Sequence, residues 1–253
     1  MDPLEAAGLA AAGFAAGAIN SVAGGGSLIS FPALVAVGYS SKVANVTNSV
    51  ALWPGYLGGS FGYRQELRLQ RRTVRLLALP SIAGAIAGSA ILLATPAAAF
   101  DQIVPFLILF ACVLMATQDR IAALVAGRRG AGSEPDAASP AILVATFVLG
   151  IYGAYFGAGL GILTLAILGI LLPGDAQHSN ALKGMLSLIM NAVAVVYFAA
   201  FGPVRWAPAA LMAVAALAGG YLGVGVARRL GKRWLRLAVI TYGLAAAIVM
   251  FVR

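Results

Sequence analysis

Two clusters of polar side chains lie within apolar stretches of this chain, and their residue types could bind an anion. The first cluster is NVTN, with Asn45, Thr47 and Asn48, and the second is NALK, with Asn180 and Lys183. In each cluster the outer two residues are three positions apart and share one face of a helix. Amide and ammonium groups donate hydrogen bonds, which suits a small monoanion or dianion. These residues are costly in an apolar segment unless they are paired or in contact with water.

Glycines interrupt the apolar stretch ahead of each cluster, as GGG at 24–26 and as GAGLG at 157–161. A non-helical backbone at membrane depth is tolerated only where protein buries it or water reaches it. Free amides at the start of the following helix carry partial positive charge, which suits an anion. We therefore predict a substrate-binding site formed by Asn20, Gly24, Gly25, Gly26, Ser27, Asn45, Asn48, Gly157, Gly159, Gly161, Asn180 and Lys183.

Each of these residues also has a purely structural interpretation. Glycines in membrane helices commonly allow close packing or act as hinges, and Asn side chains form hydrogen bonds between helices. Lys183 could extend its ammonium group to the lipid headgroups. The single histidine, His178, is a candidate for proton coupling because imidazole titrates near neutral pH, and the alternative of an exposed loop residue stays open. The recurrence of the whole pattern favours the binding site.

The two patterns indicate an internal duplication. A shift of 133 residues aligns the glycines of the two halves: Gly17 with Gly150, Gly24 with Gly157 and Gly26 with Gly159. After a two-residue insertion near Pro173, the same alignment pairs Asn45 with Asn180 and Asn48 with Lys183. We expect a first membrane repeat at 1–126, a flexible cytoplasmic linker at 127–139 and a second membrane repeat at 140–253.

The composition places the protein in a bilayer. Of the 253 residues 61% are hydrophobic and only 10% are charged, so there is too little polar surface for a soluble globule. Most of the 17 Lys and Arg residues lie in three short segments, at 64–75, 120–129 and 228–236. Such segments mark the cytoplasmic loops of an inner-membrane protein and argue against nucleic acid as a partner. The opening Met-Asp-Pro-Leu-Glu has no basic region, so we expect no cleaved signal peptide.

The residue inventory argues against an enzyme. Cys112 is the only cysteine, which excludes a disulfide framework and a thiolate metal site within one chain. Asp101, Asp119 and Asp175 lie at the ends of apolar segments, so we expect no intramembrane carboxylate pair for a metal or for hydrolysis. No nucleophile can be assembled with a base and an orienting group. We therefore expect neither catalysis nor a bound cofactor or metal.

Apolar runs divide each half into five helical segments. They are 4–22, 27–37, 43–61, 74–94 and 103–125 in the first half, and 141–155, 161–172, 181–201, 207–226 and 235–252 in the second. A spanning helix needs about 20 residues. The second segment of each half is shorter than this, so it is predicted to form a re-entrant hairpin with its predecessor or a short inner helix.

The charges then fix the predicted topology. With the three basic segments inside, both termini lie outside and the second half is inverted relative to the first. Inverted repeats with broken helices are typical of secondary transporters, whose sites form where the breaks meet near the midplane. The predicted fold is an all-α polytopic membrane protein with two inverted repeats of about five hydrophobic helical segments each, the second segment of each half being short or re-entrant.

The chain resembles the sulfite exporter TauE/SafE family of small bacterial membrane permeases. Three runs carry the resemblance: GFAAGAINSVAGGGSLISFPAL, VANVTNSVALWPGYLGGSFGYRQEL and SNALKGMLSLIMNAVAVVYFAAFGPVRW. The similarity covers nearly the whole chain, although the second glycine cluster is GAGLG in place of a full GGG. It implies an inner-membrane carrier of small sulfur-containing anions such as sulfite, sulfoacetate or thiosulfate, driven by the proton-motive force or another gradient.

The function expected from residues and resemblance together is secondary transport, in the direction of export, of sulfite or organosulfonates by alternating access around the broken helices. The expected partners are that anion, the lipid bilayer and a coupling proton, with a homodimer left open. Two alternatives remain at this point: an anion channel for the same cargo class, and a membrane-embedded assembly partner that transports nothing.

Overall fold

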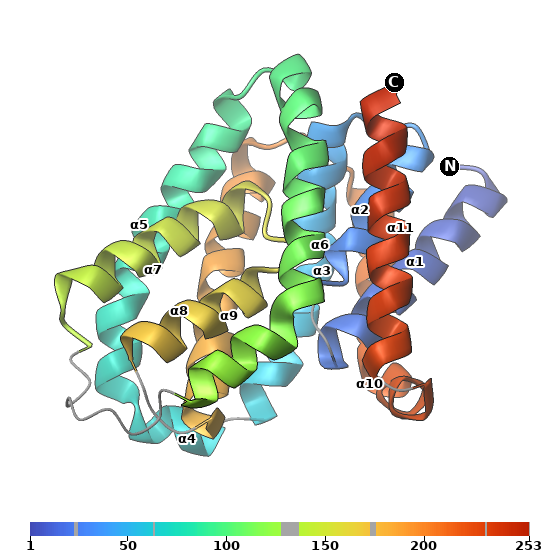
Figure 1. Ribbon diagram of the computed structural model, residues 1–253. Coiled ribbons are helices and arrows are strands. Elements are labelled where there is room, and N and C mark those ends of the chain that lie inside the picture. The colour runs from blue at the N-terminus through green and yellow to red at the C-terminus, as the bar shows by residue number, and fades with distance from the viewer. Residues whose placement is uncertain (23–24, 63, 128–136, 173–175, 231, 253) are drawn as a thin grey trace.

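Helices make up all the regular structure of the described chain. The computed structural model describes residues 1–22, 25–62, 64–127, 137–172, 176–230 and 232–252 (Figure 1). Across these ranges there are helices and no strand. The helices are α1 (Pro3–Val22), α2 (Ser27–Ala36), α3 (Ser41–Gly62), α4 (Arg64–Leu69), α5 (Arg71–Ala94), α6 (Ala97–Gly127), α7 (Pro140–Tyr155), α8 (Leu160–Leu171), α9 (Ala176–Phe201), α10 (Trp206–Leu230) and α11 (Lys232–Val252). The predicted all-α fold is confirmed.

The short helices α2 and α8 lie directly after the two glycine clusters, as the sequence predicts. At the second break Gly157 and Gly159 have φ angles of 74° and 75°, a left-handed conformation that only glycine adopts without strain. At the first break Gly25 has a φ of 84°. The sequence does not predict α4, a six-residue helix in the basic segment between α3 and α5.

The main helix contacts of one half have counterparts in the other. α1 packs on α10 as α7 packs on α5, and α3 packs on α10 as α9 packs on α5. Figure 1 shows α5 and α7 crossing on one side of the molecule and α1 and α10 on the other. The corresponding helices α3 and α9 contact each other, and so do α6 and α11. This exchange of partners is the pattern that a pseudo-two-fold axis between the halves produces.

The corresponding helices α6 and α11 run antiparallel. The ring of Phe106, near the start of α6, lies 5.1 Å from that of Phe251 at the end of α11. Asp119, toward the end of α6, forms an ion pair at 2.6 Å with Arg236 near the start of α11. An axis that relates antiparallel helices is perpendicular to them, as an inverted repeat requires. The inversion across a membrane and the limits of the two repeats stay predictions.

Glycines let the backbones approach closely at the two crossings. A Cβ atom added at these positions would meet partner backbone: that of Ala216 at Gly17, of Phe14 at Gly219, of Ser81 at Gly150 and of Phe147 at Gly84. The first two join α1 to α10, and the last two join α7 to α5. Close approach through small residues is the usual way in which membrane helices associate, because lipid supplies no hydrophobic driving force between them.

Apolar side chains are exposed over much of the outer surface. Those on α5, α6, α10 and α11 include Leu79, Phe106, Val113, Val214, Leu217 and Ile248. An exposed apolar surface of this extent is matched by lipid and not by water. Within the described residues three helical stretches are long and apolar enough to cross a membrane: Arg71–Ala94, Ala97–Leu124 and His178–Phe201. The structure thus confirms a polytopic membrane protein.

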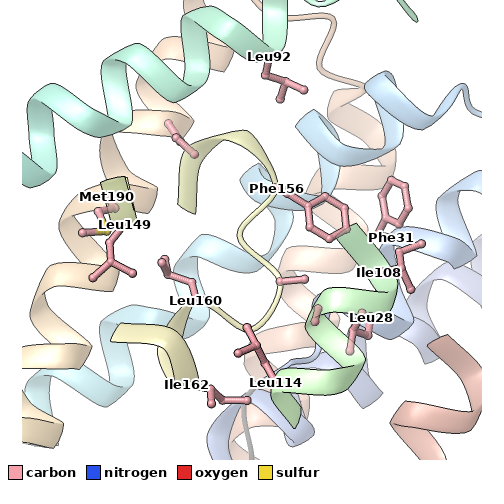
Figure 2. Packing of buried hydrophobic residues seen from close by; sticks show 14 of the residues in the cluster. Leu28, Phe31, Leu92, Ile108, Leu114, Leu149, Phe156, Leu160, Ile162 and Met190 are labelled. Atoms are coloured by element: carbon pink, nitrogen blue, oxygen red, sulfur yellow. The ribbon is translucent and has the colours of Figure 1, made fainter. Parts of the chain in front are cut away.

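The buried core surrounds the second break. Figure 2 shows Phe156, in the turn between α7 and α8, beside Phe31 of α2, and their ring centroids are 5.7 Å apart with an edge-to-face geometry. Leu149 of α7 and Leu160 of α8 belong to the same cluster, as does Leu114 of α6. The break is therefore surrounded by packed apolar side chains from both halves.

Replacing Gly17 by Ala is expected to destabilise the protein by about 1–3 kcal/mol, because the added methyl group meets backbone atoms of Ala216 that cannot move without displacing α10. Gly8→Ala on the same helix is the matched control, since nothing lies within 4 Å of the Cβ it adds and Ala is the better helix former. Thermal unfolding in detergent measures both variants. Equal stability of the two would contradict the close crossing.

Candidate functional site

At the first break the backbone is hydrogen-bonded by a side chain from the same half of the chain. The Asn20 side chain, in the last turn of α1, accepts a hydrogen bond at 2.8 Å from the backbone N–H of Gly26. The Ser30 hydroxyl donates to the Gly26 carbonyl at 3.2 Å. Of the predicted residues here, Gly24 lies outside the described residues. The N–H and the carbonyl of Gly26 are thus both satisfied without a ligand.

The second break is held by a side chain from the other half. Asn45 of α3 donates its amide N–H to the carbonyl of Tyr155, the last residue of α7, at 2.9 Å. Two positions further on, the Thr47 hydroxyl accepts from the backbone N–H of Arg205 at 3.1 Å. Both bonds fasten α3 to the second half of the chain. The predicted role of Asn45 in anion binding is untested by these contacts and stays a prediction.

One segment of α6 faces both breaks. A Cβ at Gly25 would meet the end of the Met115 side chain, and a Cβ at Gly159 would lie 3.3 Å from Leu114. Both α6 residues are buried. Gly25 and Gly159 therefore contact the neighbouring α6 residues Met115 and Leu114, so α6 packs against both glycine clusters.

Lys183 lies beside the start of α8. A Cβ at Gly161, in the first turn of α8, would lie 3.9 Å from Cδ of Lys183. The ammonium nitrogen is 3.2 Å from the side-chain oxygen of Asn180. Within the described part of the chain no carboxylate pairs with it. Of the predicted residues, Gly161, Asn180 and Lys183 are thus brought together, with one half-buried cation and no acidic partner among the described residues.

Asn48 occupies the position in α3 that corresponds to Lys183 in α9. It is only 2% exposed, and its side-chain oxygen has no hydrogen-bond partner among the described residues. α3 and α9 pack on each other. A buried amide oxygen without a partner is costly, but as an acceptor it does not itself bind an anion. The predicted role of Asn48 as a donor to the substrate stays a prediction.

His178 lies in the first turn of α9 and is half-buried. Its carbonyl accepts a hydrogen bond from Gln70 at 3.1 Å, between α9 and the junction of α4 with α5. Its proposed part in proton coupling stays a prediction.

Three further polar residues become visible only in the structure. The Lys42 ammonium donates to the carbonyls of Leu93 and Thr95 at 2.6 and 2.8 Å, at the C-terminal end of α5. The hydroxyls of Thr164 and Ser187 are buried without a partner in the described chain. A lysine near a turn and single hydroxyls in apolar helices are common, so local sequence contains no signal that distinguishes them.

Comparison with known proteins decides the family. The model of the family described as sulfite exporter TauE/SafE matches residues 9–250. The chain belongs to the TauE/SafE sulfite exporter family. No solved structure gave a significant match to it. Among the described residues no three His, Cys, Asp or Glu side chains gather into a group that could hold a metal ion.

The TauE/SafE match extends to curated proteins of similar length. A "probable membrane transporter protein" of Haemophilus influenzae is 27% identical over 90% of this chain and 87% of its own. The "probable membrane transporter protein ORF9" of a Sinorhizobium species is 26% identical over 94% and 88%. The "probable membrane transporter protein YfcA" of Escherichia coli K12 is 24% identical over 89% and 81%. Family and relatives alike point to a membrane transporter.

Lys42→Met is expected to lower the free energy of unfolding by about 2 kcal/mol, because the charged hydrogen bonds to the C-terminal carbonyls of α5 are lost. Lys42→Arg keeps the charge and the donors and should retain more of the stability. Thermal unfolding in detergent compares the two. A methionine variant as stable as the parent would show that Lys42 does not cap α5.

Proposed function

We propose that this TauE/SafE protein is a secondary transporter that exports small sulfur-containing anions, sulfite or organosulfonates, across the bacterial inner membrane. The family name and the transporter names of its relatives support transport through a membrane. The cargo, the direction and the mechanism are the proposal.

Lys183 is the observation that carries the proposal. It lies two turns into α9, within a stretch long and apolar enough to span a membrane, and no carboxylate neutralises it in the described chain. An uncompensated ammonium group is costly at membrane depth. A bound anion would supply the missing counter-charge, and Gly161, at the positive N-terminal end of α8, lies beside the lysine side chain.

In the proposed mechanism the anion binds by the second break, with Gly159, Gly161, Asn180 and Lys183 around it and with Asn45 and Asn48 presented by α3. The predicted contribution of Gly25, Gly26 and Ser27 comes from the first break, where Gly25 contacts Met115 of α6, and Gly24 lies outside the described residues. Access to this site then alternates between the two membrane faces. The proton-motive force is the proposed drive, with His178 as the candidate proton carrier.

The packing indicates which helices would move together. The close glycine crossings join α1 to α10 and α7 to α5, and each crossing takes one helix from either half of the chain. Backbones in direct contact leave no space for sliding, so each pair is a rigid unit. The rocking bodies we propose are therefore a unit around α1 and α10 and a unit around α5 and α7.

The charge distribution supports the proposed orientation. In Figure 1 the N- and C-termini lie toward one end of the molecule, while α4 and the junction of α10 with α11 lie at the other. Arg68, Arg71, Arg72 and Arg75 belong to the second end. The positive-inside rule supports the proposal that this end is cytoplasmic and that both termini lie in the periplasm.

The binding test is a thermal shift of the detergent-purified protein with sulfite, sulfate, thiosulfate, sulfoacetate, taurine and chloride. An anion at 100 times its dissociation constant should stabilise the parent by about 2.7 kcal/mol. Lys183→Met should abolish this shift without loss of basal stability, because it removes an unpaired cation. Asn48→Ala should weaken the shift, and Gly8→Ala should leave it unchanged. Parent-like binding by both Lys183→Met and Asn48→Ala would overturn the proposed site.

The transport test uses proteoliposomes loaded with the anion that gives the largest shift. A carrier should show saturable uptake and exchange against unlabelled anion on the other side. Flux that neither saturates nor exchanges would identify a channel. If correctly inserted protein moves no anion, the proposal fails in favour of a membrane assembly partner.

A further inference from the structure

Two buried hydroxyl groups lie on α8 and α9, which pack on each other. Thr164 of α8 is fully buried and Ser187 of α9 is 3% exposed. Neither hydroxyl has a hydrogen-bond partner in the described chain. Since a buried hydroxyl without a partner is costly, each of these groups has a donor available to a ligand.

Many hydroxyls in the other helices avoid that cost. They donate to the carbonyl four residues earlier in their own helix, as do Ser30, Ser49, Ser81, Thr95, Thr117, Thr146 and Thr241. This bond is the usual solution for Ser and Thr in an apolar helix. Thr164 and Ser187 depart from the pattern. So does Ser89 on α5, but that helix packs mainly on α7 and α9 and not on α8.

Both hydroxyls lie within about one helical turn of the contact between Gly161 and Lys183. Thr164 follows Gly161 by three residues and Ser187 follows Lys183 by four, so each shares a helix face with its neighbour. A Cβ at Gly161 points at the lysine chain, and α8 packs on α9. The first turn of α8 therefore lies beside the Lys183 side chain, and each hydroxyl lies about one turn from that contact along its own helix.

The first half has no equivalent donor set. There Asn20 already satisfies the N–H of Gly26. The positions that correspond to Thr164 and Ser187 are Phe31 and Leu52, and that of Lys183 is the neutral Asn48. The scaffold is duplicated, but at these three positions the lysine and the two hydroxyls occur only in the second half.

We infer that Thr164 and Ser187 are anion ligands, and that with Lys183 they form a single site per chain, in the second half, which takes a monoanionic sulfur oxyanion. This rests on the proposed function and narrows its substrate class. One ammonium neutralises one negative charge. A dianion such as sulfate would leave a net charge in the apolar interior, which the two neutral hydroxyls do not offset.

Isothermal titration of the purified full-length protein with methanesulfonate and with sulfate, at one fixed pH, tests the inference. The two probes are sulfur oxyanions of similar size that differ in charge. The parent should bind one methanesulfonate per chain and at least about tenfold more tightly than sulfate. Thr164→Val and Ser187→Ala should each weaken methanesulfonate binding by about tenfold, the usual effect of losing a hydrogen bond to a charged group.

Matched controls separate binding from folding. Thr146→Val removes a hydroxyl that bonds to its own helix, and Ser89→Ala removes an unpartnered one away from α8, so both should bind like the parent. Thr164→Val and Ser187→Ala should also melt at the same temperature as the parent or higher without anion, because each deletes an unsatisfied group. A purely structural role would lower that temperature and leave the affinity unchanged.

The outcomes distinguish the two proposals. If the parent binds methanesulfonate and depends on Lys183, but Thr164→Val and Ser187→Ala bind as tightly as the parent, this inference is overturned and the transport proposal stands. Sulfate bound as tightly as methanesulfonate, or two anions per chain, would also overturn it. If neither probe nor any anion of the thermal-shift panel binds, both proposals fail together.

Discussion

The structure depends on one constraint: in an apolar medium every interrupted helix must have its exposed backbone groups satisfied by the protein. The chain has two such breaks, and at each one a polar side chain forms a hydrogen bond with the backbone. At the first break Asn20, from the same half, accepts from the N–H of Gly26. At the second break Asn45, from the opposite half, donates to the carbonyl of Tyr155. The second bond makes the break in one repeat dependent on the position of α3 from the other.

Around these breaks the framework is symmetric and the polar chemistry is not. The pairing of α1 with α10 repeats as α7 with α5, and the same kind of glycine-to-backbone contact closes both crossings. Within this framework Asn48 and Lys183 hold corresponding positions. A duplicated fold with a few divergent positions can keep two matched hinges and place its charge on one side only, which suits a carrier that moves one anion through symmetric outward and inward states.

Much of the fold could be predicted from the sequence because its signals are local. Apolar runs bounded by glycines gave the helix bounds to within several residues, and the glycine clusters marked both breaks. The repeat could be recognised because the glycines and asparagines of the two halves occur at nearly the same spacing, Gly17 and Asn45 in the first half and Gly150 and Asn180 in the second. The family followed from the same residues. α4 was missed because a six-residue helix made of charged and apolar residues has no distinctive period.

Only the tertiary structure decided what each polar residue contacts. Sequence treats Asn20, Asn45 and Asn48 alike, yet the first two are occupied by backbone groups and the third has a free oxygen. Lys42 and Lys183 are both lysines near polar turns, but one caps α5 and the other stands unpaired beside α8. Whether a polar side chain has a hydrogen-bond partner depends on atoms that lie far away in the chain. The spacing of residues along the sequence does not show which of these atoms come close. The sequence by itself therefore determined the helices, the breaks and the family, whereas packing between the halves decided which side chains stay free to bind.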